Sequence, residues 1–433
     1  SNEGSGTVTR SSANVTINVT GRSGQTGGLV GNNVGTIESS TARGTVELKK
    51  GMLVGGLVGI NSGTVNASSA EGMETVAGSL QVGGLIGGNS GGTVHTSSAE
   101  EIKSVNGTLH VGGLIGIHAG GTVNASSATG RTTVKGDSFV AGLIGGTFSR
   151  IADSHANVKV KGNKSVGGLV GGNGGESFPL NFNENQSFPG GTISNSTATG
   201  AVTAPAGVTG EKVGGLVGQL YRGTITRSSA SGTVDAPDAT HVGGLVGYAD
   251  GTEPEPQGGG QRPIPVRTIR ESYATGDVTG NESVGGLVGT TRNETIVHSY
   301  AVGNVTGDTA VGGLVGTHTG TNANVTEAYA AGTVSGGTDV GGLIGTTQAS
   351  PTVESAYWDT ETAAQSSSEG GTDLNTSQLK ANESLAGFDF QHTWDVVDNK
   401  THSSYPYLLN NTQSPPPGVG PVQSGPVDLY AGG

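Results

Sequence analysis

The sequence predicts an all-β protein: a parallel β-solenoid of about eleven or twelve coils, with three short strands per coil and a small C-terminal cap. Three observations predict this fold: a glycine-rich phrase that recurs along the chain, a repeat length of 28–29 residues, and short segments rich in β-branched residues between turn residues. The chain has 433 residues and 82 glycines, without the Gly-X-Y period of collagen. A propeller blade needs about 40 residues, which this repeat cannot supply.

The recurring phrase is typified by VGGLVG, and its central leucine marks each coil. Eight of the ten steps between these leucines are 26 to 29 residues long, and the two longer steps contain the insertions 174–191 and 250–267. A solenoid tolerates insertions at repeat boundaries, because they bulge from one coil without shifting the next. The eleven leucines are Leu29, Leu57, Leu85, Leu114, Leu143, Leu169, Leu216, Leu245, Leu287, Leu314 and Leu343.

One repeat is expected to form three strands, which in residues 213–234 are VGGLVG, TITRSSA and SGTV. Like segments of neighbouring coils would pair in parallel about 4.8 Å apart, which gives a rod of roughly 55 Å. The leucine of VGGLVG and the valine after it are both apolar. Either a corner separates them and both face inward, or one of them forms an apolar stripe outside. We expect the corner, because glycine allows both φ > 0 and a close approach of backbones.

A row of serines follows the second segment. The apolar residue of that segment is followed three positions later by serine, which breaks the two-residue alternation of a strand and predicts a bend or bulge. A buried serine there can bond to the backbone or to the serine one coil away, so we interpret the row as structural. Its members are Ser11, Ser40, Ser68, Ser97, Ser126, Ser154, Ser196, Ser228, Ser272 and Ser299.

The two ends of the chain differ in composition. Residues 1–357 form the predicted solenoid, and residues 358–409 gather aromatic side chains and a short helix, which we interpret as a cap on the last coil. Residues 410–433 have the composition of a linker, but their last part could add as a strand to an exposed edge. The candidate residues for this contact are Val427, Leu429 and Tyr430. The sequence begins inside a repeat, so we expect an open edge on the first coil.

Four tyrosines in one repeat position are further candidates for an interface. The last four repeats have tyrosine where earlier repeats have mostly serine or threonine, and this position points outward if the flanking residues point inward. The row could be a ladder of stacked rings that stabilises the array, a contact surface for another protein, or a platform for sugars. The four are Tyr273, Tyr300, Tyr329 and Tyr357.

Asn-x-Ser/Thr triplets are frequent and predict N-glycosylation on a secreted surface. The alternative is that repeats copy a triplet by descent. Asn66 and Asn124 do share a repeat position, but most triplets do not. The sixteen candidate acceptors are Asn14, Asn18, Asn66, Asn106, Asn124, Asn163, Asn185, Asn195, Asn281, Asn293, Asn304, Asn324, Asn375, Asn382, Asn399 and Asn410.

The sequence contains no recognisable catalytic or metal-binding motif. It has no Walker A loop, HExxH helix, EF-hand loop or nucleophile elbow, and it has no cysteine. The nine histidines are scattered without metal-ligand spacing, and we expect them on the solvated surface. We therefore expect a protein that is not an enzyme, with no catalytic residues, no cofactor and no metal.

The chain resembles the GLUG-motif repeat proteins, a family named for a Gly-Leu-x-Gly core. The resemblance is carried by GGLVG at 27–31, by the S-Y-A-x-G phrase at 272–276 and 299–303, and by closing phrases between 355 and 408. It implies a secreted or cell-surface protein of bacteria or archaea, often an adhesin-like one, and the motif carries no catalytic residues. The few lysines, the acidic excess and the many triplets resemble an archaeal surface protein.

These features predict an extracellular structural protein, a glycosylated subunit that assembles end to end with itself into a cell-surface filament or layer. The alternative is a monomeric adhesin that binds a glycan or protein through the loops 174–191 and 250–267 or through the tyrosine row. Surface glycans are therefore candidate partners. The net charge of −13 without a basic stripe argues against nucleic acid. No apolar run approaches the length of about 18 residues that indicates a transmembrane helix.

Overall fold

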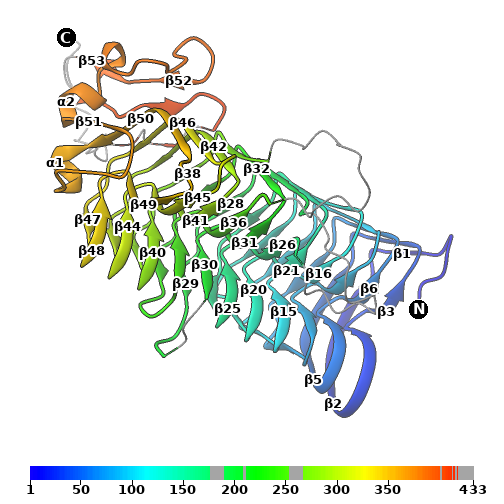
Figure 1. Ribbon diagram of the computed structural model, residues 1–433. Coiled ribbons are helices and arrows are strands. Elements are labelled where there is room, and N and C mark those ends of the chain that lie inside the picture. The colour runs from blue at the N-terminus through cyan, green and yellow to red at the C-terminus, as the bar shows by residue number, and fades with distance from the viewer. Residues whose placement is uncertain are drawn as a thin grey trace, which may run out of the picture.

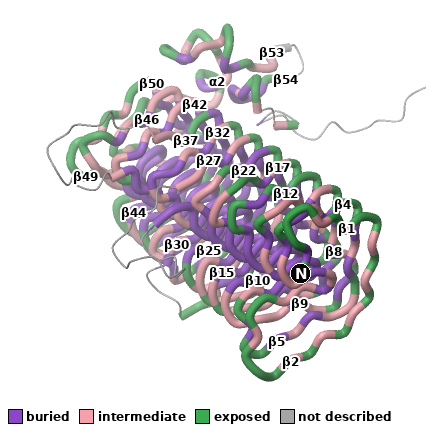
Figure 2. Tube along the Cα trace, turned by 90° about the vertical axis from the view of Figure 1, so that its right-hand side faces the viewer, coloured by how far each residue is buried: buried purple, intermediate pink, exposed green. Residues whose placement is uncertain are grey.

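The computed structural model is a parallel β-solenoid, as the sequence predicts (Figure 1). It describes residues 1–175, 190–207, 211–252, 267–399 and 402–411, together with residues 413, 414 and 417. The coils stack along a rod, and a small C-terminal region lies against the last of them. One continuous apolar core runs along the inside of the rod (Figure 2).

The middle coils have five short strands rather than three, because two of the predicted segments bend in the middle. One such coil consists of β15 (Leu109–Gly112), β16 (Ile115–His118), β17 (Thr122–Asn124), β18 (Ser127–Thr129) and β19 (Thr133–Lys135). Strand β16 belongs to an 11-stranded parallel sheet, and the other four belong to a second sheet of 40 strands. The smaller sheet also contains β3 (Val30–Asn33), β6 (Val58–Asn61), β11 (Ile86–Asn89), β21 (Ile144–Thr147), β26 (Val170–Asn173), β31 (Val217–Tyr221), β36 (Val246–Asp250), β41 (Val288–Arg292), β45 (Val315–Thr319) and β49 (Ile344–Gln348).

The glycine-rich phrase forms the predicted corner. In residues 213–218, strand β30 (Lys212–Gly214) ends at the first glycine of the phrase and β31 begins at Val217, so the chain turns at Gly215 and Leu216. Leu216 and Val217 are both 0% exposed and lie in the core. This confirms that a corner separates them and that both face inward.

Close approach between coils, and not positive φ, explains the glycines at the corner. A Cβ at Gly215 would meet the carbonyl oxygen of Gly244 one coil away, and a Cβ at Gly244 would meet that of Gly286. Neither Gly215 nor Gly244 has positive φ. The backbones of neighbouring coils therefore pass too closely at this point for any side chain.

The serine ladder is continuous through ten coils. The backbone N–H of each serine donates to the Oγ of the serine in the next coil, at 3.1–3.3 Å. The Oγ itself donates to the carbonyl two residues earlier, as from Ser126 to Asn124 at 2.9 Å. The residue before each serine adopts a left-handed φ, for example +48° at Ala125. This residue is the predicted bend.

A second polar ladder, made of asparagines, is absent from the sequence prediction. Asn2, Asn33, Asn61 and Asn89 are buried, and the Nδ2 of each of the first three donates to the Oδ1 of the next at 2.7 Å. The Nδ2 of Asn89 then donates to Nδ1 of buried His118 at 3.0 Å. Each buried amide thus finds its partner in the neighbouring coil, which removes the cost of burying it.

The first coils contain the longest strands, β2 (Ser12–Gly27) and β5 (Thr41–Gly55), which pair with each other (Figure 1). Within the described part of the chain, β1 (Thr7–Thr9) and β2 pair with other strands on one side only, whereas β3 also bonds to Asn2, whose N–H donates to the Asn32 carbonyl at 2.8 Å. Val15, Ile17 and Val19 of β2 are only partly buried against the core. The outer edges of β1 and β2 therefore have no strand partner among the described residues.

The chain itself covers the other end of the core. Trp358, on β50 (Thr352–Asp359), takes the position that Ala330 holds in the preceding coil and lies against Gly342. Ser368 Oγ accepts a hydrogen bond from the Ile344 N–H at 2.9 Å, where a further coil would otherwise pair. The remaining described elements are α1 (Thr360–Ala363), β51 (Thr372–Leu374), α2 (Thr376–Leu379), the 3₁₀ helix η1 (Asn382–Ser384), β52 (Trp394–Asp395), β53 (Asp398–Asn399), β54 (His402–Ser403) and β55 (Tyr407–Leu408).

The serine ladder yields a test of the fold. We expect Ser126→Ala to lower the free energy of unfolding by about 1–3 kcal/mol, because it leaves the buried N–H of Ser97 without its acceptor. Ser127→Ala, at the half-buried neighbour, should stay within about 0.5 kcal/mol of wild type. Urea unfolding followed by circular dichroism and amide hydrogen exchange at Ser97 would measure both effects. Equal unfolding midpoints and equal exchange for the two variants would show that the ladder contributes nothing.

Candidate functional site

An open pocket of about 420 Å³ lies where the two insertions leave the rod. The insertions follow β26 and β36, which are two coils apart with β31 between them. Residues 176–189 and 253–266 lie outside the described residues, but the roots of both insertions line the pocket. These root residues are Gly174, Gly175, Asp250 and Thr252. The other lining residues are Phe139, Lys212, Gln219, Tyr221, Tyr248 and Arg292.

Two rows of side chains cross the floor of the pocket. Gln219 on β31 lies beside Tyr248 on β36, and Tyr221, Asp250 and Arg292 form a second row on β31, β36 and β41. On β31 and β36 the residue between the two rows is buried in the core. Strand alternation therefore sends both rows outward, away from the core.

The ammonium group of Lys212 is held inside the pocket. Its Nζ lies 4.7 Å from the centre of the Tyr248 ring and donates to Gln219 Oε1 at 3.1 Å. Burial lowers the pKa of Lys212, and the charge of Asp250 acts in the opposite direction. The ring of His241 lies 5.1 Å from that of Tyr248. Tyr248 is thus fixed between a cation and a second ring, which orients it before any ligand arrives.

Asp250 supplies the carboxylate of the pocket lining. Its Oδ1 accepts from the Thr252 N–H at 2.8 Å, and its Oδ2 accepts from the Tyr248 hydroxyl at 3.2 Å. Nη1 of Arg292 lies 3.9 Å from the same Oδ2, and the Arg292 side chain is 53% exposed. Because a guanidinium has five N–H donors and this contact is long, Arg292 keeps donors for a ligand.

A buried carboxyl group lies beside the root of the second insertion. Glu294 is 0% exposed, and its carboxyl oxygens have no hydrogen-bond partner among the described residues. Burial raises the pKa of Glu294 to about 8; the charge of Arg267 opposes this rise and that of Asp250 adds to it. Earlier coils place glycine at the equivalent position, as at Gly92. The repeat itself therefore does not require a carboxyl group here.

The tyrosine row is a contact within the chain. Tyr300 and Tyr329 are 0% exposed, and the ring centres of Tyr273, Tyr300 and Tyr329 are 4.9 and 5.1 Å apart, so the rings stack from coil to coil. The C-terminal region covers them: Trp394 lies 6.2 Å from Tyr300 and 6.0 Å from Tyr329. The Tyr329 hydroxyl donates to the Pro406 carbonyl at 2.6 Å. The hypothesis that this row is an open surface for a protein or a sugar is therefore wrong.

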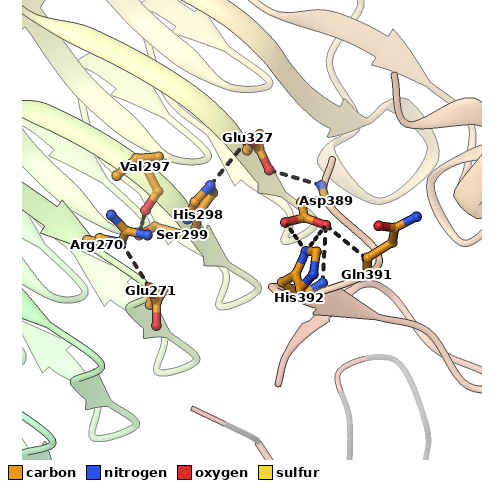
Figure 3. Close-up of polar contacts among 9 residues, drawn as sticks. All are labelled: Arg270, Glu271, Val297, His298, Ser299, Glu327, Asp389, Gln391 and His392. Carbon is orange, nitrogen blue, oxygen red and sulfur yellow. Dashed lines mark hydrogen bonds and ion pairs between the residues drawn. The ribbon is translucent and has the colours of Figure 1, made fainter. Parts of the chain in front are cut away.

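Polar contacts beside the tyrosine row join the C-terminal region to the rod (Figure 3). Glu327 Oε1 lies 3.2 Å from His298 Nε2 of the preceding coil, and Glu327 Oε2 accepts from the Asp389 N–H at 3.1 Å. The Asp389 carboxylate accepts from the backbone N–H groups of Gln391 and His392. These bonds, that from Gln391 first, lower the pKa of Asp389. The Glu327 carboxylate thus contacts both the preceding coil, through His298, and the C-terminal region, through Asp389.

The asparagines of the Asn-x-Ser/Thr triplets are accessible wherever their side chains are described. Asn185 lies outside the described residues, as does the side chain of Asn399, and none of the other fourteen is buried. The buried Asn33, Asn61 and Asn89, by contrast, are not part of such triplets. Glycosylation itself stays a prediction. Val427, Leu429 and Tyr430 of the tail also lie outside the described residues.

Comparison with known families bears on these repeats. The family model described as the GLUG motif matches residues 162–203 and 209–235, which contain the corners at Leu169 and Leu216. Residues 162–235 therefore carry GLUG repeats. No curated protein and no solved structure matches it. GLUG repeats on a β-solenoid fit a surface protein of adhesin-like or structural type.

Other expectations for this chain concern metals, membranes and histidines. In the ranges that the structure describes, no group of three or more His, Asp or Glu side chains is placed to hold a metal ion, and no helix is long and apolar enough to cross a membrane. The expectation of solvated histidines is wrong for His110, His118 and His318, which are 0% exposed. Burial lowers their pKa values to about 3, 4 and 4. They are neutral parts of the packing.

Sequence reasoning located the two insertions but missed the pocket between them. A signal exists in the GLUG repeat: the position of Gln219 and Tyr248 is occupied by glycine in three earlier coils, Gly88, Gly146 and Gly172. The other three earlier coils have Asn32, Ile60 and Ile117 there, so the repeat fixes no residue type at this position. Two successive large polar side chains, at 219 and 248, are a departure that packing does not demand. Comparing positions across coils for such departures would have indicated the site.

Glu294 predicts a pH dependence of stability. Its folded pKa of about 8 lies above the unfolded value of 4.5, so between these pH values the folded state holds a proton that the unfolded state has lost. Stability contributed at this site therefore falls as pH rises from 4.5 to 8. We expect Glu294→Gln to flatten this fall by on the order of a few kcal/mol, because the amide stays neutral. Urea unfolding at pH 5 and pH 8 measures the difference.

Glu282→Gln, at an exposed position, serves as the control for losing one surface carboxylate. Wild type and Glu294→Gln with the same pH slope would contradict the prediction.

Proposed function

We propose that this protein is a non-catalytic, extracellular adhesin. Its binding site is the pocket that lies on the rod between the two insertions. One observation carries the proposal. Two segments that interrupt an otherwise regular repeat leave the same corner of the rod two coils apart, and their roots line a single pocket.

The chemistry of the pocket supports binding rather than packing. Its lining combines tyrosine rings with amide, carboxylate, ammonium and guanidinium groups, which are the orienting groups of ligand sites. Its volume of about 420 Å³ falls within the range of about 300–1,000 Å³ for such sites. An extracellular location is supported by the GLUG repeats and by the accessible asparagines of the Asn-x-Ser/Thr triplets.

Replacing both insertions tests this function. In the variant, residues 174–191 and 251–267 are each exchanged for Ala-Gly-Gly, the connection that residues 119–121 make between β16 and β17. We expect wild type to bind members of a panel of immobilised glycans and cell-surface fractions, and the variant to lose at least about tenfold in affinity while its circular dichroism is unchanged.

A variant with Lys49 and Lys50 changed to serine, at exposed positions of β5, controls for surface changes far from the pocket. Unchanged binding by the insertion variant, or no binding by wild type, would count against an adhesin.

End-to-end assembly is a second candidate, and one observation favours it: the unpaired edge and partly buried valines of the first coil. A strand edge of this kind accepts a further strand from another molecule. The last coil cannot be the matching surface, because Trp358 and Ser368 already cover it. The joint would therefore use the tail, residues 410–433. Sedimentation and electron microscopy should show filaments for the full chain and monomers for a variant ending at residue 409. A full chain that stays monomeric at high concentration excludes this candidate.

A further inference from the structure

We infer that the pocket binds an acidic glycan, with a uronic-acid carboxylate directed to the guanidinium of Arg292 and the ammonium of Lys212. This inference rests on the proposed function, because it names the ligand of the same pocket. Three features of the described residues carry it: the charge of the lining, the paired strands of the floor, and the direction in which the pocket runs.

The lining concentrates cations in an acidic chain. The sequence has 21 Lys and Arg against 34 Asp and Glu, whereas the lining has Lys212 and Arg292 against the single carboxylate of Asp250. Arg292 is about half exposed, and its nearest contact with Asp250 is long, at 3.9 Å. The N–H donors in the plane of its guanidinium can therefore pair with a second carboxylate. The ligand that this arrangement recognises carries negative charge.

The floor of the pocket disfavours a peptide. Strand β31 is paired with β26 and β36 on its two sides, and β36 is paired with β31 and β41. A peptide therefore finds no open strand edge along which to add its backbone. Apart from the tyrosine rings, Phe139 is the one apolar side chain among the described lining residues, whereas protein contacts prefer a larger apolar centre; the lining offers in addition Gln219 and Thr252. These groups match the hydroxyls and ring faces of sugars.

The pocket follows the rod axis. From the coil of Gly174 to that of Arg292 there are three coil steps, or about 14 Å at about 4.8 Å per step. Gly175 has a φ of +122°, and a Cβ built on it would meet only Gln219 Nε2 at 3.5 Å, so a ligand can approach the backbone closely at that end. An extended oligosaccharide fits this length better than a single sugar.

Calorimetric titration of the full chain at low ionic strength tests the inference with tetragalacturonate and its carboxyl-reduced counterpart, which has the same linkages without charge. We expect the acidic tetrasaccharide to bind at least about tenfold more tightly than the neutral one. Arg292→Gln should weaken binding of the acidic ligand about tenfold and leave the neutral ligand unchanged. Arg131→Gln, at an exposed arginine outside the pocket, should change neither.

Equal affinity for the two tetrasaccharides, no binding of either, or no effect of Arg292→Gln would overturn the inference. So would a poly-glutamate peptide that binds as tightly as tetragalacturonate, because it would show that the site selects charge and not sugar. If the insertion variant loses its surface binding while tetragalacturonate never binds, the proposed function stands and only the ligand class is wrong.

Discussion

The distance between neighbouring coils at the glycine corner is the constraint on which the rest of this structure depends. At Gly215 and Gly244 the backbone of one coil lies where a Cβ would be. The coils are thereby held at strand spacing, about 4.8 Å, along the rod. The interior next to the corner must also be small: a Cβ at Gly113 would contact the Ala128 methyl group as well as the next backbone. A chain with this corner cannot fold one coil alone, because each corner is completed by the next coil.

A fixed spacing turns single side chains into ladders. Serine bonds to serine, asparagine to asparagine, and tyrosine stacks on tyrosine at 4.9 and 5.1 Å, because each side chain meets the same position one coil away. This explains how buried polar groups are tolerated throughout a narrow core: their partners are supplied by repetition. It also separates fold from function, since a residue that matches its ladder serves stacking. Tyr248, by contrast, pairs with the unlike residues Gln219 and Thr290, and Glu294 stands where earlier coils have glycine.

The features that recur with the repeat were predictable, and those that occur once were not. Eleven leucines, the inward corner and the serine bend all follow from periodicity and strand alternation. Three strands were predicted rather than five because each segment that contains one of these bends was counted as a single strand, whereas the bend divides it into two. A stacked ladder was one of three alternatives that the sequence left open for the tyrosine row. Its cover comes from residues near position 394, which no local pattern connects to Tyr300. The pocket joins residues from separate coils, so only the register of the paired strands shows that these residues lie side by side.

The C-terminal cap and the pocket occupy different parts of the rod. The C-terminal region closes the end of the core with Trp358 and covers the tyrosines of the last four coils, so that part of the surface is already in use. The insertions lie on earlier coils, whose strands are paired on both sides and whose side chains are held at strand spacing. A site built there gains rigidity from the stack without interrupting it, because an insertion leaves the register of the next coil intact. That arrangement lets a binding surface vary through its loops while the spacing of Tyr221, Asp250 and Arg292 stays set by the backbone.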